Sequence, residues 1–416
     1  MSRRPAVLFL AHLLPWPLVG GGQMKSFHTL EALAARYDIR LLSFVRSEEE
    51  ARTLGPLPDL CRRGVRTVPR PRGRLHNLRA LLRAERTGGS FVVGRDDSPA
   101  FRAAVVEELS RAEYAAIHAD HLPMAAYLPV AGVAPPRRVL DQHNAEHVLW
   151  RRLAESPLTP PPVRLLAHRE WPRLRAAEAA LCQSADRVLA VSEEDARALR
   201  GLMGSESSAH VSVVPIAVDT EHFAPGHDRL APAPDALVSF GTLYWPPNVA
   251  GLEWFCREVL PRVRSHRPGA KLTLAGAGPN RAARRLAALP GVTLEADVPD
   301  IRPLAARSRV LVVPLFAGSG VRVKLLCALA MGLPVVSTPL GAEGLEGARD
   351  GEHLLLAETA EAFADAVTRV LSDDALAARL AQNGRALVER SYARGPVADR
   401  LLAAYEQTLA GEGVPR

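Results

Sequence analysis

Arg322 and Lys324 stand two positions apart beside a glycine-bearing turn, within a stretch that runs from residue 309 to residue 345. A guanidinium and an ammonium group at this spacing can both make charge-assisted hydrogen bonds with phosphate oxygens. A helix that begins at the turn would add backbone N–H groups and the positive end of its dipole. These residues therefore predict a corner that holds a diphosphate.

The elements that must position these two residues form one β-α-β unit. Val310–Pro314 is a short β-branched run, typical of a strand buried on both faces, and a turn follows at 316–320. Apolar residues then fill most positions of a predicted helix over Val321–Met331, which residues 332–334 end, and the next strand is predicted over 335–338. Because such junctions occur in every doubly wound sheet, a merely solvated first helical turn is the alternative interpretation.

The sequence of this unit, RVLVVPLFAGSGVRVKLLCALAMGLPVVSTPLGAEGL, resembles the nucleotide-sugar-binding segment of the family 4 glycosyltransferases (glycosyl transferases group 1). One branch of that family reads G-x-G-x-R-x-K-x-L-E-A-x-A-M-G-x-P-V-V-S-T-x-x-G-A-E-G-L, and nearly all of this pattern is present. The resemblance implies the GT-B fold, an α/β architecture of two Rossmann-like, doubly wound parallel-sheet domains that face an interdomain cleft. It also implies transfer of a sugar from a nucleoside diphosphate sugar to a hydroxyl acceptor, with retention at the anomeric carbon.

The resemblance places the donor-binding residues along this unit. In chain order they are Ser319, Gly320, Val321, Arg322, Lys324 and Cys327. The family usually has glutamates at the positions of Ser319 and Cys327, and the second of these accepts hydrogen bonds from the ribose hydroxyls. A thiol is only a weak acceptor, so Cys327 indicates a weakened ribose contact or, since free cysteines are often buried, a core residue.

A triple-glycine segment, Gly20, Gly21 and Gly22, lies in a predicted loop over 14–23 that separates a strand from a helix. Glycines let a phosphate or a sugar approach the backbone closely. In the resembling family this loop contacts the donor phosphates or the acceptor, so we expect Gly21 and Gly22 to bind the donor.

Histidines and acids follow two predicted strands of the first half of the chain, at 118–121 and at 142–147. Because the carboxyl ends of parallel strands meet at one edge of a sheet, both groups should face its mouth. His143 stands where the family has the histidine beside the donor sugar, and we expect it to be the catalytic residue. His118, His121 and His147 do not show zinc-ligand spacing, so we predict no metal and no cofactor.

The loop at 241–248 departs from the family pattern. Thr242 and Pro247 stand where many members carry an arginine and a lysine that hold the diphosphate, and Asn248 is predicted to cap the next helix. With Cys327, this departure keeps open a second class of function, a catalytically weak GT-B protein that binds a nucleotide sugar or supports a partner transferase. A nucleotide-sugar epimerase of the same fold is a third alternative, which the transferase-like motif disfavours.

Length and composition favour two globular domains. The 416 residues suit two domains of about 200 residues each. The GT-B resemblance implies an N-terminal acceptor-side domain at 1–220, a linker at 221–236, a nucleotide-sugar-binding domain at 237–395 and a helix at 396–416 that returns to the first domain. Hydrophobic residues make up 48% and charged residues 23%, with no apolar run of about 18 residues to span a bilayer. Four widely spaced cysteines argue against a disulfide framework and favour the cytoplasm.

The net charge of +7 is concentrated in the segment 62–86, which holds nine arginines and one acid, Glu85. Such a segment suits an anionic surface on the inner face of a membrane, where a lipid-linked acceptor would lie. Nucleic acid is another polyanion, but no aromatic residues are interleaved for base stacking. A solvated arginine-rich face is the third interpretation.

Overall fold

The computed structural model describes residues 4–128, 136–204, 210–226 and 232–411. The chain forms two compact units, the first made of residues up to 154, 165–217 and from 397 on, and the second of 155–164 and 218–396. Residues 227–231 of the predicted linker and 412–416 of the predicted last helix lie outside the described residues. Residues 155–164, which the sequence analysis counted in the first domain, therefore group with the second.

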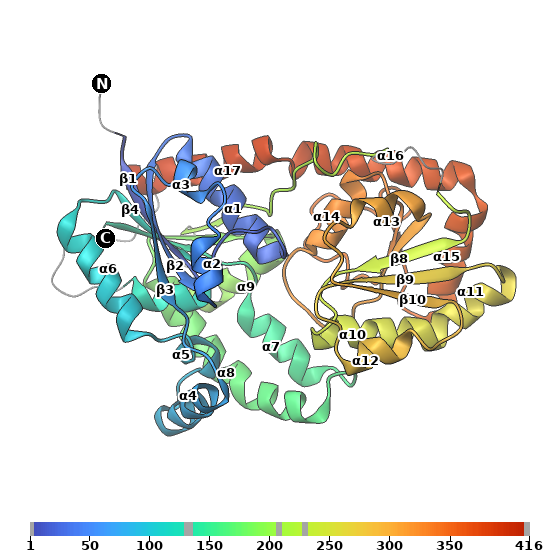
Figure 1. Ribbon diagram of the computed structural model, residues 1–416, viewed down its shortest axis with the longest axis horizontal. Helices are drawn as coiled ribbons and strands as arrows, with labels where there is room; N and C mark the ends of the chain where they lie inside the picture. The colour runs from blue at the N-terminus through green and yellow to red at the C-terminus, as the bar shows by residue number, and fades with distance from the viewer. Residues whose placement is uncertain (1–3, 129–135, 205–209, 227–231, 412–416) are drawn as a thin grey trace. The chain divides into compact units, whose positions relative to one another are not determined.

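The first unit is a seven-stranded, fully parallel sheet in the order β3-β2-β1-β4-β5-β6-β7, flanked by helices (Figure 1). The strands are β1 (Ala6–Ala11), β2 (Asp38–Val45), β3 (Val65–Pro69), β4 (Ala116–Asp120), β5 (Arg137–Asp141), β6 (Arg187–Ala190) and β7 (Val211–Val213). The helices are α1 (Gly21–Ala34), α2 (Glu48–Arg52), α3 (Leu57–Leu60), α4 (Arg74–Thr87), α5 (Phe91–Gly94), α6 (Pro99–Arg111), α7 (Glu146–Glu155), α8 (Pro161–Gln183) and α9 (Glu193–Met203), with a 3-10 turn at Leu122–Tyr127. The last helix, α17 (Arg394–Ala410), packs on this unit from Val397 onward.

The alternation of side chains along β1 divides the core of the first unit between the two faces of the sheet. Leu8 and Leu10 belong to one buried cluster with residues of α6, and Phe9 belongs to the other with residues of α1. Tyr405 of α17 lies in this second cluster. Helices therefore cover both faces, which leaves the carboxyl edge of the sheet as the place where polar side chains gather.

The second unit is a six-stranded parallel sheet in the order β10-β9-β8-β11-β12-β13. Its strands are β8 (Ala236–Phe240), β9 (Lys271–Gly276), β10 (Val292–Ala296), β11 (Val310–Val313), β12 (Val335–Ser337) and β13 (Leu355–Leu356). Its helices are α10 (Pro246–Trp254), a π-helical segment at Phe255–Val259, α11 (Leu260–His266), α12 (Arg281–Leu286), α13 (Arg302–Arg307), α14 (Val323–Ala330), α15 (Ala360–Ser372) and α16 (Asp374–Ser391). The predicted β-α-β unit is present as β11, α14 and β12, and Arg322 takes the N-cap position of α14.

Two local predictions were wrong. Helix α1 begins at Gly21, so Gly21 and Gly22 lie in its first turn, because Gly20 adopts the extended N-cap conformation and its carbonyl accepts the Met24 N–H at 3.0 Å. Helix α10 begins two residues before Asn248, at Pro246, since the fixed φ of proline suits the first turn.

The start of α9 follows a local sequence pattern. Ser192 caps α9 by accepting the Asp195 N–H at 3.1 Å, and a serine three residues before an acid is the spacing of a capping box. Among the described helices, none combines the length and the apolarity that crossing a membrane requires.

Candidate active site

The loop between β11 and α14 wraps around the side chain of Arg322. A guanidinium nitrogen of Arg322 donates a hydrogen bond to the carbonyl of Ser319. Gly318 has φ 152°, and a Cβ at this position would lie 2.6 Å from Arg322 Nη2. The loop therefore needs glycine at 318 for its backbone conformation, and a side chain at this position would displace the guanidinium.

Lys324, in the first turn of α14, extends to the loop that follows β8. Its Nζ donates to Asn248 Oδ1 at 3.3 Å, and the Asn248 amide nitrogen donates to the carbonyl oxygen of Thr242 at 3.0 Å and to its Oγ1 at 3.1 Å. A Cβ on Gly241 would lie 3.6 Å from Lys324 Nζ, and one on Gly276 only 1.7 Å from the carbonyl oxygen of Gly241. The segment that follows β8 thus surrounds the ammonium group of α14, and the end of β9 packs against this segment, at the strand edge where open parallel sheets bind ligands.

The ammonium group of Lys324 lies in an environment suited to an anion. Burial, with the nearby charge of Arg322, lowers its pKa to about 8. Within the described ranges, no carboxylate lies within 4.0 Å of this nitrogen, and its hydrogen-bond partner, Asn248, is neutral. A phosphate group bound here would supply the missing negative charge and would raise the pKa again.

The other residues predicted to bind the donor lie close by in the chain. Ser319 and Val321 are buried in the loop that carries Arg322, with Gly320 between them at φ 75°. Cys327 lies one helical turn after Lys324 and is 3% exposed. Burial raises the pKa of its thiol to about 12, so the side chain is a neutral thiol.

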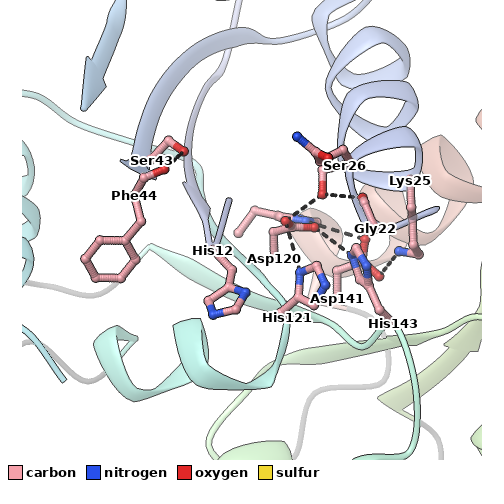
Figure 2. A network of polar contacts seen from close by, with 12 residues as sticks. His12, Gly22, Lys25, Ser26, Ser43, Phe44, Asp120, His121, Asp141 and His143 are labelled. Carbon is pink, nitrogen blue, oxygen red and sulfur yellow. Dashed lines mark hydrogen bonds and ion pairs between the residues drawn. The ribbon is translucent and has the colours of Figure 1, made fainter. Parts of the chain in front are cut away.

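A second polar cluster occupies the carboxyl edge of the first unit's sheet (Figure 2). Asp120 and Asp141 end β4 and β5 and lie opposite each other in the strand register, both fully buried. His121 follows with φ 79°, and its backbone N–H donates to the Asp141 carbonyl oxygen at 2.9 Å. Two acids and two histidine-bearing loops therefore meet at one point, as the sequence predicts for neighbouring strand ends.

His143 and Asp120 are joined directly in this cluster. His143 Nε2 lies 2.8 Å from Asp120 Oδ1, while Asp120 Oδ2 accepts the Ser26 hydroxyl at 2.7 Å and lies 3.3 Å from His121 Nδ1 (Figure 2). The His121 and His143 rings lie with their centroids 3.4 Å apart. A Cβ on Gly22 would be 3.5 Å from His121 Nε2 and 3.8 Å from His143 Nδ1. The structure thus brings Gly22 and His143 together.

The environment fixes the charge states of this pair. Burial, reinforced by the neighbouring His121, holds the pKa of His143 well below its ordinary value, so the imidazole is neutral at pH 7. Burial opposes ionisation of Asp120, but His143 and His121 outweigh it and hold the pKa of this carboxyl well below its usual range. A neutral His143 beside an ionised Asp120 carries its proton on Nε2, and this N–H donates a hydrogen bond to the carboxylate, which makes Nδ1 an acceptor.

Buried groups from α1 and α17 complete the network. Lys25 forms a buried ion pair with Asp141 (Figure 2), whose pKa is raised by burial and by Asp120 although Lys25 opposes the shift. His118 Nδ1 lies 2.7 Å from the Tyr405 hydroxyl, and burial lowers the pKa of His118 to about 3. The cluster is therefore held rigidly by fully buried partners, which favours a fixed orientation of His143.

Two buried acids, which the sequence analysis missed, hold the loop that carries His143. Glu178 of α8 accepts hydrogen bonds from the backbone N–H groups of Glu146 at 3.0 Å and His147 at 2.9 Å. These N–H groups belong to the first turn of α7, where they have no carbonyl partner within the helix. Asp195 of α9 accepts the Ala145 N–H at 2.8 Å. A signal for Glu178 exists in the sequence, because it falls in the buried stripe of α8 at helical spacing with Leu174 and Cys182.

Two sets of side chains in this cluster offer atoms with metal-ligand spacing, within 4.8 Å of one another. They are Asp120, His121 and His143, and His118, Asp120 and Asp141. Both sets share Asp120, whose oxygens already accept hydrogen bonds from Ser26 and the histidines. Lys25 adds a positive charge to the same network. We therefore interpret the cluster as a hydrogen-bonded support for His143.

Residues 234–373 match the family model described as Glycosyl transferases group 1, which confirms the predicted family over this part of the chain. A curated relative, an uncharacterized 44.6 kDa protein of the cps region of Klebsiella pneumoniae, is 28% identical over 161 residues. The matching segment is 36% of this chain and 41% of that relative, so the chain matches about two fifths of the relative's length.

Solved structures resemble the chain over nearly its whole length. Sucrose-phosphate synthase from Thermosynechococcus elongatus matches with a TM-score of 0.72 at 20% identity, over 97% of this chain and 99% of that one. HepE from Anabaena, solved in complex with UDP and glucose, matches with a TM-score of 0.66 at 16% identity over the same shares. At these identities the likeness shows the fold, and the chain has the predicted GT-B fold.

Proposed function

We propose that this chain, whose residues 234–373 match the glycosyl transferases group 1 family and whose fold is GT-B, is a glycosyltransferase. It would move a sugar from a nucleoside diphosphate sugar to a hydroxyl acceptor. The observation that carries the proposal is the corner around Arg322 and Lys324, where two cations from one helix end meet beside glycine-rich turns. HepE, a protein of the same fold, was solved with UDP-glucose, which supports a donor of this class.

In this proposal the diphosphate binds at the N-terminus of α14. Arg322 and Lys324 would neutralise its charge, and the loop at Ser319–Val321 would offer backbone N–H groups to its oxygens. The same contacts would strengthen as the bond to the sugar breaks, since negative charge then develops on the departing diphosphate. The second unit would thereby stabilise the leaving group without a metal ion.

His143 is the proposed catalytic residue. As a neutral imidazole with its Nε2 proton directed at Asp120, it would accept a hydrogen bond from a donor-sugar hydroxyl through Nδ1, beside Gly22. Such a contact orients the sugar during formation of the oxocarbenium-like transition state. We propose retention at the anomeric carbon, on the basis of the family resemblance, and the anomeric configuration of the product, read by NMR, tests it.

A catalytically weak protein that binds a nucleotide sugar is the second candidate function. It is favoured by the loop before α10, where Thr242 accepts hydrogen bonds from Asn248 and Pro247 lies in the first helical turn, so that neither supplies a cation. Cys327, a neutral thiol, supplies no carboxylate for a ribose. We propose cytoplasmic location for either function, since all four cysteines are free.

The deciding experiment measures binding and turnover on the same purified protein. A panel of nucleoside diphosphates in a thermal-shift assay identifies the donor nucleotide, and hydrolysis of the corresponding nucleotide sugars measures chemistry at the donor. Slow donor hydrolysis, together with faster release of nucleoside diphosphate and formation of a glycosylated product when a hydroxyl acceptor is added, supports the transferase. Tight binding without hydrolysis or transfer supports the second candidate, and interconversion of sugar epimers without an acceptor would contradict both.

A further inference from the structure

Helix α4 carries three exposed leucines on a single face. Leu75, Leu78 and Leu82 are 72%, 52% and 54% exposed, and their spacing of three and four residues places them in one stripe along the helix. Ala84, the buried residue of α4, projects from the opposite side of the helix. The stripe therefore faces away from the side by which α4 packs on the protein.

Polar contacts from several directions around the helix anchor α4 to its own unit. His76 Nε2 lies 2.7 Å from the carbonyl oxygen of Arg95, and Arg83 forms an ion pair with Asp97 at 3.2 Å. Glu85 accepts two hydrogen bonds from Arg173 of α8, at 3.0 and 2.9 Å. In Figure 1, α4 lies beside α8, and α5 lies between α4 and the sheet. The exposed stripe thus belongs to a helix that is fixed in place.

Arginines border the leucine stripe. At 100° per residue, Arg79 and Arg86 project beside the leucines, and Arg72 and Arg74 precede the first of them. Across the described part of the chain, these four arginines have no carboxylate within 4.0 Å. The acid of this helix, Glu85, is occupied by Arg173. The outward face of α4 is therefore both apolar and strongly positive.

We infer that α4 is a membrane-contact helix, which inserts Leu75, Leu78 and Leu82 into an anionic lipid surface and sets its arginines among the headgroup phosphates. An apolar stripe flanked by basic residues is the pattern of helices that lie in the plane of a membrane interface. Nucleic acid would use the arginines but would leave the leucines in water, so the leucines distinguish the two polyanions. The inference concerns a surface of the first unit and does not depend on the proposed chemistry.

The first test is flotation of the full-length protein with vesicles of phosphatidylglycerol and phosphatidylcholine, against phosphatidylcholine alone. We expect binding to the acidic vesicles that weakens as salt rises. The triple variant Leu75→Ser, Leu78→Ser, Leu82→Ser should lower binding at least about tenfold, since three apolar side chains leave the lipid. Arg79→Gln with Arg86→Gln should do the same, whereas the matched pair Arg52→Gln with Arg197→Gln, exposed in the same unit, should retain binding.

The second test places a polarity-sensitive fluorophore on the helix. Leu78→Cys can be labelled selectively because all four native cysteines are buried. Its emission should shift to the blue with acidic vesicles, and the same label at Val106→Cys, an exposed position on α6, should not respond.

Absent vesicle binding, vesicle binding that the leucine variant leaves unchanged, or binding to duplex DNA without vesicle binding would each overturn the inference. None of these readouts requires turnover, so they leave the proposed transferase reaction to its own test.

Discussion

Asp120 Oδ1 lies 2.8 Å from His143 Nε2, although the two residues are 23 positions apart in the chain: Asp120 ends β4, and His143 lies in the loop that follows the neighbouring strand β5. This contact sets the tautomer of the imidazole, because a buried, ionised carboxylate accepts a hydrogen bond from the Nε2–H group and leaves Nδ1 as an acceptor. Asp120 thereby positions His143 in the proposed reaction.

His143→Ala should lower kcat by about 100-fold, the usual cost of removing one hydrogen-bonding group from a preorganised site, and should change donor affinity little. Asp120→Asn should cause a smaller loss, since an amide oxygen can still accept the Nε2 proton but carries no charge. Steady-state kinetics and donor titrations measure both, with His168→Ala, an exposed histidine of α8, as the control. A loss confined to KM would assign His143 to ground-state binding.

Arg322→Ala and Lys324→Ala should each weaken donor affinity by roughly 1.5–3 kcal/mol, as expected for charge-assisted hydrogen bonds. Calorimetric titration with a nucleoside diphosphate measures the change. Arg281→Ala and Lys271→Ala, exposed cations of the same unit, serve as charge-matched controls and should bind as the wild type does. The diphosphate assignment fails if neither site variant changes affinity while the controls behave as expected.

Much of this architecture could be predicted from the sequence. Features formed by residues close together in the sequence were predicted, and contacts between residues far apart in the sequence were not. The β11-α14-β12 unit, with Arg322 and Lys324, is local, so periodicity and a glycine turn suffice to predict it. The buried strands of both sheets can be predicted for the same reason, because each is a short apolar run. Lys25 pairs with Asp141 across 116 positions, and no local rule predicts such a pair.

The error at Asn248 has the same origin. Local propensity favours asparagine as a helix cap, but the side chain instead joins Thr242 to Lys324, 76 residues away in the sequence. Tertiary contact overrode the local preference, and the proline at 246 then began the helix earlier. The exposed leucines of α4 were missed because helical apolar spacing alone does not tell a core face from an outward one.

Donor affinity should depend on pH through Lys324. In the free protein burial lowers the pKa of this side chain to about 8, whereas a bound diphosphate stabilises the charged form and raises it. Binding should therefore be accompanied by proton uptake near pH 8 and above, and affinity should fall as pH rises through this range. Calorimetry in buffers of different ionisation enthalpy measures the uptake, and Lys324→Met should abolish it. An uptake that persists in this variant would assign the proton to another group.

Lys324→Met should stabilise the fold while it weakens donor binding. The folded pKa of about 8 lies below the ordinary 10.5, so the unfolded chain binds more protons between these values and stability rises with pH there. Below pH 8 the cost of burying the ammonium is fully present. Removing the charge should then raise the free energy of unfolding at pH 7 by about 1–2 kcal/mol. Denaturant titrations at pH 7 and pH 10 test the sign, because the gain should shrink at pH 10.

Cys327 should make donor binding insensitive to the ribose hydroxyls. A carboxylate at this position could accept hydrogen bonds from both hydroxyls, whereas a neutral, buried thiol is a weak acceptor and cannot bind a diol at two points. We therefore expect ribose and deoxyribose forms of the same nucleoside diphosphate to bind within about threefold of each other, because the charge-assisted contribution of roughly 1.5–3 kcal/mol is missing.

The variant Cys327→Glu tests the same position from the other side. If the thiol borders the ribose, the longer side chain reaches the ligand, the ratio of ribose to deoxyribose affinity rises about tenfold, and the melting temperature changes little. Cys327→Ser, similar in size to the native residue, controls for the loss of sulfur and should leave the ratio near one. A wild-type protein that already rejects the deoxyribose form would contradict the weakened ribose contact. Unfolding of the glutamate variant would instead assign Cys327 to the core of α14, where a carboxylate would be buried without a partner.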